Sequence, residues 1–269
     1  MNLPGVTQLI GPNKGKTIVI MAGVHGNEHA GVLALDLLEK GLSIKSGIVY
    51  LVRANTEALR QNVRFVENNM NRCFSNSNRG TTLEERRAKE LMAILNAADV
   101  LLDLHTFNDT DGEPFVITDE QSVKVAEILD VPIISTGWDK IHIGSADGYV
   151  RFQGKVGICL ECGPIGEVRR STSMAIDSIY RVLDYYEMFE YSYPNPTPKK
   201  YVSIERSIIK RSNNLSFSKI FKNFEMLPEG RIYAKDGSIS FVSNKKECII
   251  FLRPQVPVGG EAAIIGRYL

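Results

Sequence analysis

The chain has 269 residues, of which 43% are hydrophobic and 23% charged, and its formal net charge is +1. This composition is typical of a globular protein with enough apolar residues for one large core or two smaller ones. The near-neutral charge argues against a broad basic surface that would bind nucleic acid or an anionic membrane.

The amino-terminal stretch "MNLPGVTQLIGPNKGK" lacks the basic and then apolar layout of a secretory signal peptide. No uninterrupted apolar run reaches the ~18 residues expected of a membrane span. We therefore expect a cytoplasmic protein with neither a membrane nor a nucleic acid as partner. The four cysteines include a single Cys-x-x-Cys pair, in "CLEC", and we interpret them as reduced thiols rather than as a four-cysteine zinc site.

Up to about residue 190, short apolar runs alternate with stretches of helical spacing. "KTIVIMAG", residues 16–23, is an apolar run that ends in glycine, and it predicts a buried strand followed by a helix over "EHAGVLALDLLEKG". A polar stretch from Ala54 to Thr82 predicts a long loop with a binding role. The alternation predicts an α/β fold, with a mostly parallel mixed sheet covered by helices on both faces. The other predicted strands are residues 47–52, 99–105, 131–135 and 155–163, and the other predicted helices are residues 83–98, 120–130 and 171–191.

The sequence pattern changes after "YPNPTPKK", residues 193–200, whose three prolines in eight residues indicate a linker. After it come short β-branched runs separated by turn signals such as "KDG" and "VGG". We therefore predict two domains, an α/β domain over residues 1–194 and a small β domain over residues 195–269. The predicted strands of the second domain are residues 201–210, 238–242, 247–252 and 262–269.

Polar side chains of three distant segments are expected to meet at one edge of the sheet. His25 and Glu28 follow the first apolar strand, His105 closes "VLLDLH", and Glu161 stands near the end of "GICLE". In an open α/β sheet, ligands gather at the carboxyl ends of the strands. Histidine and carboxylate ligands at such a position indicate a zinc site of the hydrolytic kind, with three protein ligands and one position left for water.

Two sets of zinc ligands are available in "GVHGNEHAG". The first is His25, Glu28 and His105. The second treats "HGNEH" as a His-x-x-Glu-His motif, in which His25 and His29 bind zinc and Glu28 is the base. The second set requires both histidines on one continuous helix, whereas Gly23 and Gly26 place His25 in a turn before the helix begins. We favour the first set.

Four pieces of the sequence, in this order, resemble the succinylglutamate desuccinylase and aspartoacylase family, relatives of the zinc carboxypeptidases. They are "GVHGNE", "VRFVENNMNRCF", "LLDLHTF" and "LECGP", and the resemblance spans roughly residues 17 to 190. It implies that one zinc ion is held by His25, Glu28 and His105. It also implies that Glu161 is the general base and acid, which takes a proton from water and later gives it to the leaving amine.

The resemblance further implies how the substrate is bound. Arg64 is expected to polarise the scissile carbonyl together with zinc. Asn71 and Arg72 are expected to bind a substrate carboxylate, since a guanidinium group pairs with a carboxylate through two hydrogen bonds. Arg151, ten residues before Glu161, matches the offset of an arginine that contacts a second substrate carboxylate in aspartoacylase-like sequences.

The chain departs from the aspartoacylase pattern at Asp147, where those sequences have a tyrosine, and this weakens the inference of an acidic product. The family's carboxy-terminal β domain contributes a tyrosine near the substrate, but spacing alone does not decide between Tyr233 and other tyrosines. His142 is a further residue that can line the pocket.

We therefore predict a zinc-dependent hydrolase that cleaves the amide bond of a small N-acyl amino acid. One alternative is a zinc carboxypeptidase or a peptidoglycan-peptide amidase, because the same groups serve peptide hydrolysis. Another is a catalytically idle relative that binds a metal or a metabolite. The sequence does not define the acyl group, the amino acid, or the metal if it is not zinc. It also leaves the oligomeric state open, and a homo-oligomer is one of the options.

Overall fold

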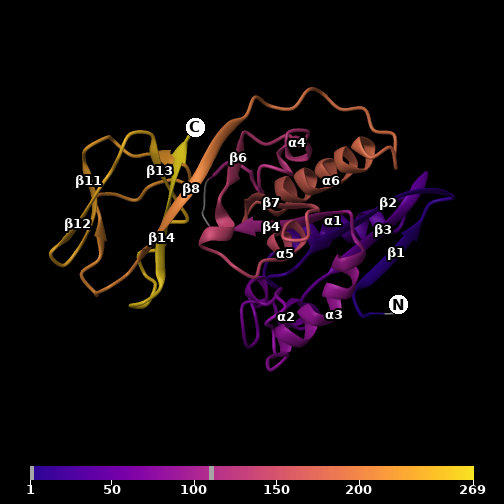
Figure 1. Cartoon of the computed structure of the whole chain (residues 1–269), viewed down its shortest axis with the longest axis horizontal. Coiled ribbons are helices and arrows are strands. Elements are labelled where there is room, and N and C mark those ends of the chain that lie inside the picture. Colours follow the sequence, from indigo (N-terminus) through magenta and orange to yellow (C-terminus); the bar gives the residue numbers. More distant parts are fainter. Residues whose placement is uncertain (1–2, 109–111) are drawn as a thin grey trace.

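A computed structural model describes residues 3–108 and 112–269, which form a large α/β part and a smaller β-rich lobe (Figure 1). The helices lie in the α/β part, and the chain then passes through a long extended segment into the lobe. In chain order the elements of the first part are β1 (Val6–Ile10), β2 (Asn13–Ala22), α1 (His29–Glu39), β3 (Ser46–Arg53), α2 (Thr56–Gln61), the 3-10 helix η1 (Met70–Arg72), α3 (Leu83–Ala97), β4 (Val100–Phe107), β5 (Phe115–Ile117), α4 (Val123–Ala126), β6 (Ile133–Thr136), the 3-10 helix η2 (Trp138–Lys140), α5 (Ala146–Arg151), β7 (Val156–Pro164) and α6 (Val168–Tyr185).

A large mixed sheet runs through the molecule in the strand order β1-β3-β2-β4-β7-β5-β6-β8-β14-β13-β10. Its central strands β3, β2, β4 and β7 are parallel, while β1 runs antiparallel to β3. β5 runs antiparallel to β7 and parallel to β6. The predicted fold class, an α/β fold with a mostly parallel mixed sheet and a small β part, is confirmed. The parallel centre brings the carboxyl ends of β2, β4 and β7 to one edge of the sheet.

Helices cover both faces of the central sheet, which explains why its strands are apolar at consecutive positions. Ile18 and Ile20 of β2 belong to the core cluster that contains α1 and α6. Val19 and Met21, which point to the opposite face, belong to the cluster that contains α3 and α5. A strand buried on both faces needs apolar side chains throughout rather than at alternate positions.

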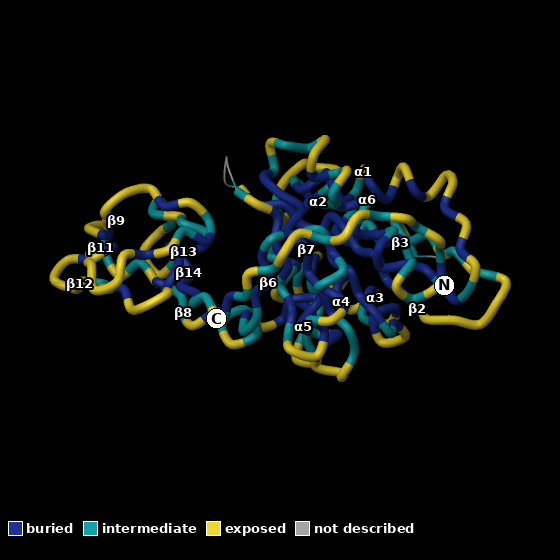
Figure 2. The backbone as a smooth tube through the Cα atoms, turned by 90° about the horizontal axis from the view of Figure 1, so that it is seen from above, coloured by how far each residue is buried: buried dark blue, intermediate teal, exposed yellow. Residues whose placement is uncertain are grey.

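The carboxy-terminal strands extend the same sheet, because β8 pairs in parallel with β6 and β14 pairs with β8. The rest of the lobe is a three-stranded antiparallel sheet in the order β12-β11-β9. Buried residues of β8, β11, β13 and β14 belong to one core cluster, and Figure 2 shows buried segments along β13 and β14. The predicted domain boundary between residues 194 and 195 falls between α6 and β8 and stays a prediction. The elements of the lobe are β8 (Lys200–Ile209), β9 (Ser216–Phe217), β10 (Glu225–Met226), β11 (Ile232–Asp236), β12 (Ile239–Val242), β13 (Glu247–Ile250) and β14 (Glu261–Tyr268).

The stretch from Ala54 to Thr82 is not the continuous loop that its polarity predicts. Asn55 accepts a hydrogen bond from the backbone N–H of Ala58 and caps α2, and Asn62 ends that helix in the left-handed conformation with φ 52°. These are ordinary start and stop signals for a short helix. The predicted helix over residues 120–130 is also shorter, since α4 covers Val123–Ala126.

All four cysteines are free thiols and are buried, in agreement with the interpretation from the sequence. Among the helices of residues 3–108 and 112–269, none is both long enough and apolar enough to cross a membrane.

Candidate metal centre and active site

The loop between β2 and α1 carries two of the candidate ligands. β2 ends at Ala22, Gly23 adopts φ +68°, and Glu28 occupies the N-cap position of α1. A Cβ atom at Gly26 would lie 2.1 Å from the backbone carbon of Ala58, so only glycine fits this close approach to α2. The turn directs His25 and Glu28 toward each other, and both side chains are buried.

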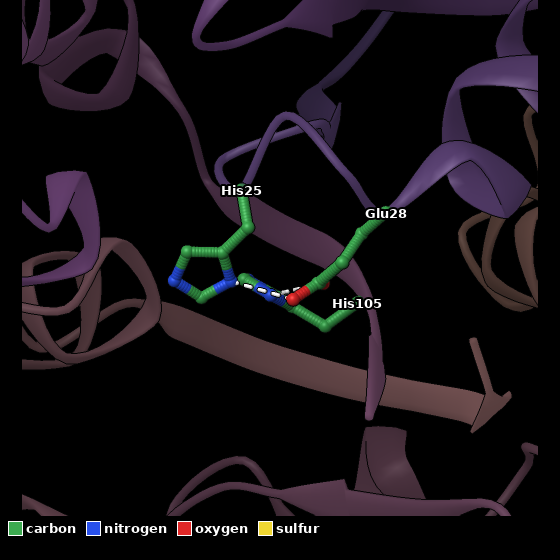
Figure 3. Close-up of side chains that lie close together, drawn as sticks. All are labelled: His25, Glu28 and His105. Atoms are coloured by element: carbon green, nitrogen blue, oxygen red, sulfur yellow. Dashed lines mark hydrogen bonds and ion pairs between the residues drawn. The ribbon is translucent and has the colours of Figure 1, made fainter. Parts of the chain in front are cut away.

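His105, the third candidate, lies on β4 and meets the other two (Figure 3). Nδ1 of His25 lies 2.7 Å from Oε1 of Glu28, and Nδ1 of His105 lies 3.1 Å from Oε2 of the same carboxylate. Candidate donor atoms of the three side chains all lie within 4.8 Å of one another. Two imidazole nitrogens and one carboxylate, facing a common point, can hold a divalent metal ion.

His29, the ligand required by the alternative His-x-x-Glu-His set, does not join this cluster. It begins α1, and its Nε2 lies 2.7 Å from Oδ1 of Asn62, so its ring faces the end of α2. The arrangement therefore favours the set of His25, Glu28 and His105 over the set that contains His29.

The nitrogen of each imidazole ring that faces away from the cluster has a polar partner. Nε2 of His25 lies 3.1 Å from Oδ1 of Asn69, and Nε2 of His105 lies 3.0 Å from Oδ2 of Asp103. Such outer contacts fix the orientation and tautomer of a metal-binding histidine. No sequence motif points to Asn69 as a partner of His25. Asp103 precedes His105 by two positions and therefore lies on the same face of β4, a spacing that could have indicated its contact with His105.

Opposite charges within the cluster shift its pKa values. Burial alone would raise the pKa of Glu28, but His25 and His105 outweigh it, and the pKa lies well below its usual value. Burial lowers the pKa of His25, which favours the neutral imidazole that a metal ion needs. Burial also disfavours the charged form of His105, yet the carboxylates of Asp103 and Glu28 raise its pKa.

Glu161 lies beside this cluster because β4 and β7 pair with His105 opposite Glu161. The residue is 8% exposed, and its Oε2 is buried without a hydrogen-bond partner among the described residues. Burial, reinforced by the Glu28 carboxylate, raises the pKa of Glu161 to about 7 against the opposing effect of His105. A buried carboxylate with an unpaired oxygen and a near-neutral pKa is well suited to accept and return a proton.

Arg64, Asn71 and Arg72 approach the cluster from the segment between α2 and α3. Nη1 of Arg64 donates to Oε1 of Glu28 at 3.2 Å. Oδ1 of Asn71 accepts from the backbone N–H of Ala146 at 3.2 Å, and Nη1 of Arg72 donates to the carbonyl of Asn71 at 2.6 Å. All three side chains line the cavity that contains the candidate metal ligands.

That cavity has a volume of about 140 Å³, and residues from distant parts of the chain form its wall. Nε2 of His142 lies 3.0 Å from Oε2 of Glu261, a contact that ties the segment after η2 to β14. No tyrosine is among the described residues that line the cavity, and Tyr233 is buried in the core of the lobe. The lining residues are His25, Glu28, Arg64, Asn69, Asn71, Arg72, His105, Thr106, Phe107, Asn108, Ile117, Trp138, His142, Cys159, Glu161, Phe251, Arg253 and Glu261.

Arg151 does not line this cavity, which argues against its expected contact with a substrate carboxylate. Its guanidinium group donates to Asp147 at 2.6 Å, to Asp139 at 2.7 Å and to the carbonyl of Gly157 at 3.1 Å. The residue is 5% exposed and Asp147 is 2% exposed. The aspartate that departs from the aspartoacylase pattern is therefore the partner of Arg151, and the pair is a buried salt bridge.

The chain is similar to known proteins over most of its length. The family model described as the succinylglutamate desuccinylase/aspartoacylase catalytic domain matches residues 14–186. A succinylglutamate desuccinylase of Shewanella amazonensis is 26% identical over 294 residues, which cover 94% of this chain and 82% of that protein. A probable aspartoacylase of Nostoc sp. is 25% identical over 196 residues, which cover 66% of each protein.

Solved structures resemble the whole fold. The crystal structure of a succinylglutamate desuccinylase from Vibrio cholerae superposes with a TM-score of 0.82 at 20% identity, and covers 98% of this chain and 85% of that one. An ectoine utilization protein from Ruegeria pomeroyi superposes with a TM-score of 0.76 at 19% identity, over 97% of this chain and 88% of that one. At such low identities the likeness concerns the fold.

Proposed function

Because the chain belongs to the succinylglutamate desuccinylase/aspartoacylase family, we propose that it is a zinc-dependent hydrolase that cleaves the amide bond of a small N-acyl amino acid. The observation that carries the proposal is the meeting of His25, Glu28 and His105 beside the unpaired Oε2 of Glu161. These residues come from three segments of the chain. Burying four ionisable groups at one point costs free energy that packing of the core alone does not explain, so the cluster supports a functional role.

The donor set supports zinc as the metal. His25, Glu28 and His105 would hold the ion through two nitrogens and one carboxylate, a combination used by zinc hydrolases. When bound, zinc supplies Lewis-acid polarisation of the acyl carbonyl and makes water more acidic. Asn69 and Asp103 would keep the two imidazole rings oriented through their outer nitrogens.

Glu161 moves the proton in the proposed reaction. Its carboxylate takes a proton from water as the water oxygen bonds to the carbonyl carbon. The protonated Glu161 then gives that proton to the amide nitrogen as the C–N bond breaks. The second proton of the water passes from the new carboxyl group to the amine, so the products are a carboxylate from the acyl group and an amino acid with a protonated amino group. Without a metal ion, burial raises the pKa of Glu161 to about 7, and a bound cation would lower it, which favours the carboxylate that acts first as base.

Arg64, Asn71 and Arg72 are the proposed binding groups. Arg64 touches the Glu28 carboxylate at 3.2 Å and lines the cavity, so its guanidinium group can stabilise negative charge on the carbonyl oxygen. Arg72 and the amide of Asn71 can bind the α-carboxylate of the amino acid through hydrogen bonds to a charged acceptor.

The cavity favours a small substrate over a long peptide. Its volume is about 140 Å³, smaller than the 300 Å³ or more that is common for drug-sized ligands. Phe251, Arg253 and Glu261 of the carboxy-terminal lobe form part of its wall. These features support an N-acyl amino acid over the substrate of a carboxypeptidase or of a peptidoglycan-peptide amidase.

The test is turnover by purified protein whose zinc content has been measured. The panel contains N-acetyl and N-succinyl amino acids, together with a tripeptide that has a free carboxyl terminus. We expect release of free amino acid from at least one acylated substrate and slower cleavage of the tripeptide. No turnover of any acylated substrate by zinc-loaded protein would contradict the proposal, and faster cleavage of the tripeptide would favour a carboxypeptidase.

A variant of the proposed base separates an enzyme from a protein that only binds a metal or a metabolite. Glu161→Gln keeps the shape of the side chain but cannot accept the proton, so we expect kcat to fall by about 100-fold or more with zinc content unchanged. Glu229→Gln, at an exposed position of the lobe, is the matched control and should behave as the wild type. Equal activity of the wild type and Glu161→Gln would remove Glu161 from the mechanism.

A further inference from the structure

The loop between β13 and β14 brings an arginine of the carboxy-terminal lobe to the catalytic cavity. Arg253 lines the cavity together with Phe251 and Glu261. Its backbone N–H donates to the carbonyl of Ala262 at 2.7 Å, which anchors the loop to β14 next to Glu261. Its guanidinium carbon lies 5.2 Å from the centre of the Phe251 ring, so the side chain has an aromatic surface at its base.

Phe251 is itself fixed in the wall of the cavity. Its ring centre lies 5.8 Å from that of Trp138 and 5.8 Å from that of Phe115, both of which are buried. Its backbone N–H donates to Oδ1 of Asn223 at 2.7 Å. The aromatic group beneath Arg253 therefore belongs to the packed junction of the lobe with the central sheet, and it can restrict where the guanidinium group points.

The charge of Arg253 acts on the groups inside the cavity. Burial, the main cause, raises the pKa of Glu161, and the positive charge of Arg253 is among the effects that oppose this rise. The neighbouring carboxylate of Glu261 already accepts hydrogen bonds from His142 and Ser207. A positive charge thus lies within electrostatic reach of the proposed base, on an element distant in sequence from Arg72.

Arg151, which the resemblance assigns to a second substrate carboxylate, contacts other residues of the protein. Arg151 donates to Asp147 and Asp139, and none of these three residues lines the cavity. Arg72 of η1 and Arg253 of the lobe both line the cavity, and they come from different elements. A substrate with one carboxylate at each end is the ligand that two such guanidinium groups fit best.

We propose that Arg253 is a specificity-determining residue that binds a second carboxylate of the substrate, in addition to the one bound by Arg72 and Asn71. This inference rests on the proposed function. The second carboxylate belongs either to the acyl group, as in an N-succinyl amino acid, or to the amino-acid side chain, as in N-acetylaspartate. The acyl carboxylate and the side-chain carboxylate have the same chemistry, and the substrates used in the test distinguish between them.

The test compares wild type, Arg253→Gln and the control Arg231→Gln, an exposed arginine of the same lobe. The substrates are N-acetylalanine, with one carboxylate, and N-succinylalanine and N-acetylaspartate, with two. We expect Arg253→Gln to lower kcat/KM by about 10- to 100-fold for one dicarboxylate substrate, mainly through KM, and by less than about 3-fold for N-acetylalanine. Loss on N-succinylalanine assigns the contact to the acyl group, and loss on N-acetylaspartate assigns it to the side chain.

Equal losses on all three substrates, or no loss on any, would overturn the role of Arg253. A wild type that turns over N-acetylalanine at least as well as both dicarboxylates would overturn it too. If the wild type turns over nothing, the proposed function fails, and calorimetric binding of succinate and butyrate to zinc-loaded protein still tests Arg253. We expect the variant to bind succinate about 10-fold more weakly and butyrate unchanged, and equal weakening of both would contradict the inference. Thermal unfolding of both variants checks that the fold is retained.

Discussion

Replacing Arg151 distinguishes a buried structural ion pair from a substrate contact. In Arg151→Met, the Asp147 carboxylate, 2% exposed, loses the guanidinium group that donates to it at 2.6 Å. Removing one partner of a buried ion pair typically costs about 3–5 kcal/mol, because the other charge stays buried and uncompensated. At roughly 2–4 °C for each kcal/mol in a protein of this size, the unfolding midpoint should fall by about 10 °C.

The assay is thermal and urea unfolding, combined with kcat/KM measured well below the unfolding transition. Arg170→Met removes an exposed pair with Glu167 and is the matched control, with an expected loss below about 1 kcal/mol. The double variant Arg151→Met/Asp147→Asn should regain part of the lost stability, because it no longer buries an uncompensated charge. Unchanged stability together with a KM raised by 30-fold or more would refute this reasoning and restore Arg151 as a substrate contact.

Two further predictions concern the catalytic centre. The rate constant kcat/KM should rise with pH as Glu161 loses its proton, through an apparent pKa at or below about 7. Burial raises the pKa of Glu161 to about 7, and a bound cation would lower it again. A pH–rate profile in which kcat/KM falls from pH 5 to pH 7 while the protein stays folded would contradict this prediction. Asp103→Asn should weaken zinc binding by about 10- to 100-fold in a competition titration with a chelator. The reason is that the carboxylate 3.0 Å from Nε2 of His105 is replaced by a neutral amide. Unchanged zinc affinity would show that this contact does not tune the metal site.

The central sheet and the meeting of His25, Glu28 and His105 were predictable from local signals combined with the order of the strands. The apolar run before Gly23 predicts a strand buried on both faces, and the glycines around His25 predict a turn rather than a continuing helix. Parallel strands place their carboxyl ends together, so the approach of His105 to His25 and Glu28 follows from the order of strands and helices.

The sequence did not predict how the carboxy-terminal strands join the rest. Their alternation indicates a β structure, but the parallel pairing of β8 with β6 is a long-range choice that depends on which sheet edge is free. The predicted strands also do not include β5, because this strand is only three residues long and is defined by its antiparallel pairing with β7. The contribution of Arg253 to the cavity depends on this junction and has no local signal.

Arg151 shows the limit of transferring a role by spacing. Its offset from Glu161 fits the aspartoacylase pattern, but Asp147 stands four residues before it on the same helix, a spacing at which opposite charges meet. The departure from the pattern at Asp147 was visible in the sequence. Its meaning, a partner that occupies the guanidinium group, required the buried environment that only the fold defines.

The most direct test of the account is the zinc content of purified, reconstituted protein, measured by mass spectrometry of the metal for the wild type and two variants. We predict one zinc ion per chain in the wild type and in His29→Ala, whose ring contacts Asn62 instead of the cluster. We predict a loss of most of the zinc in His105→Ala with the fold retained, because one of three ligands is removed. Full zinc content in His105→Ala, or loss of zinc in His29→Ala, would contradict the proposed metal site.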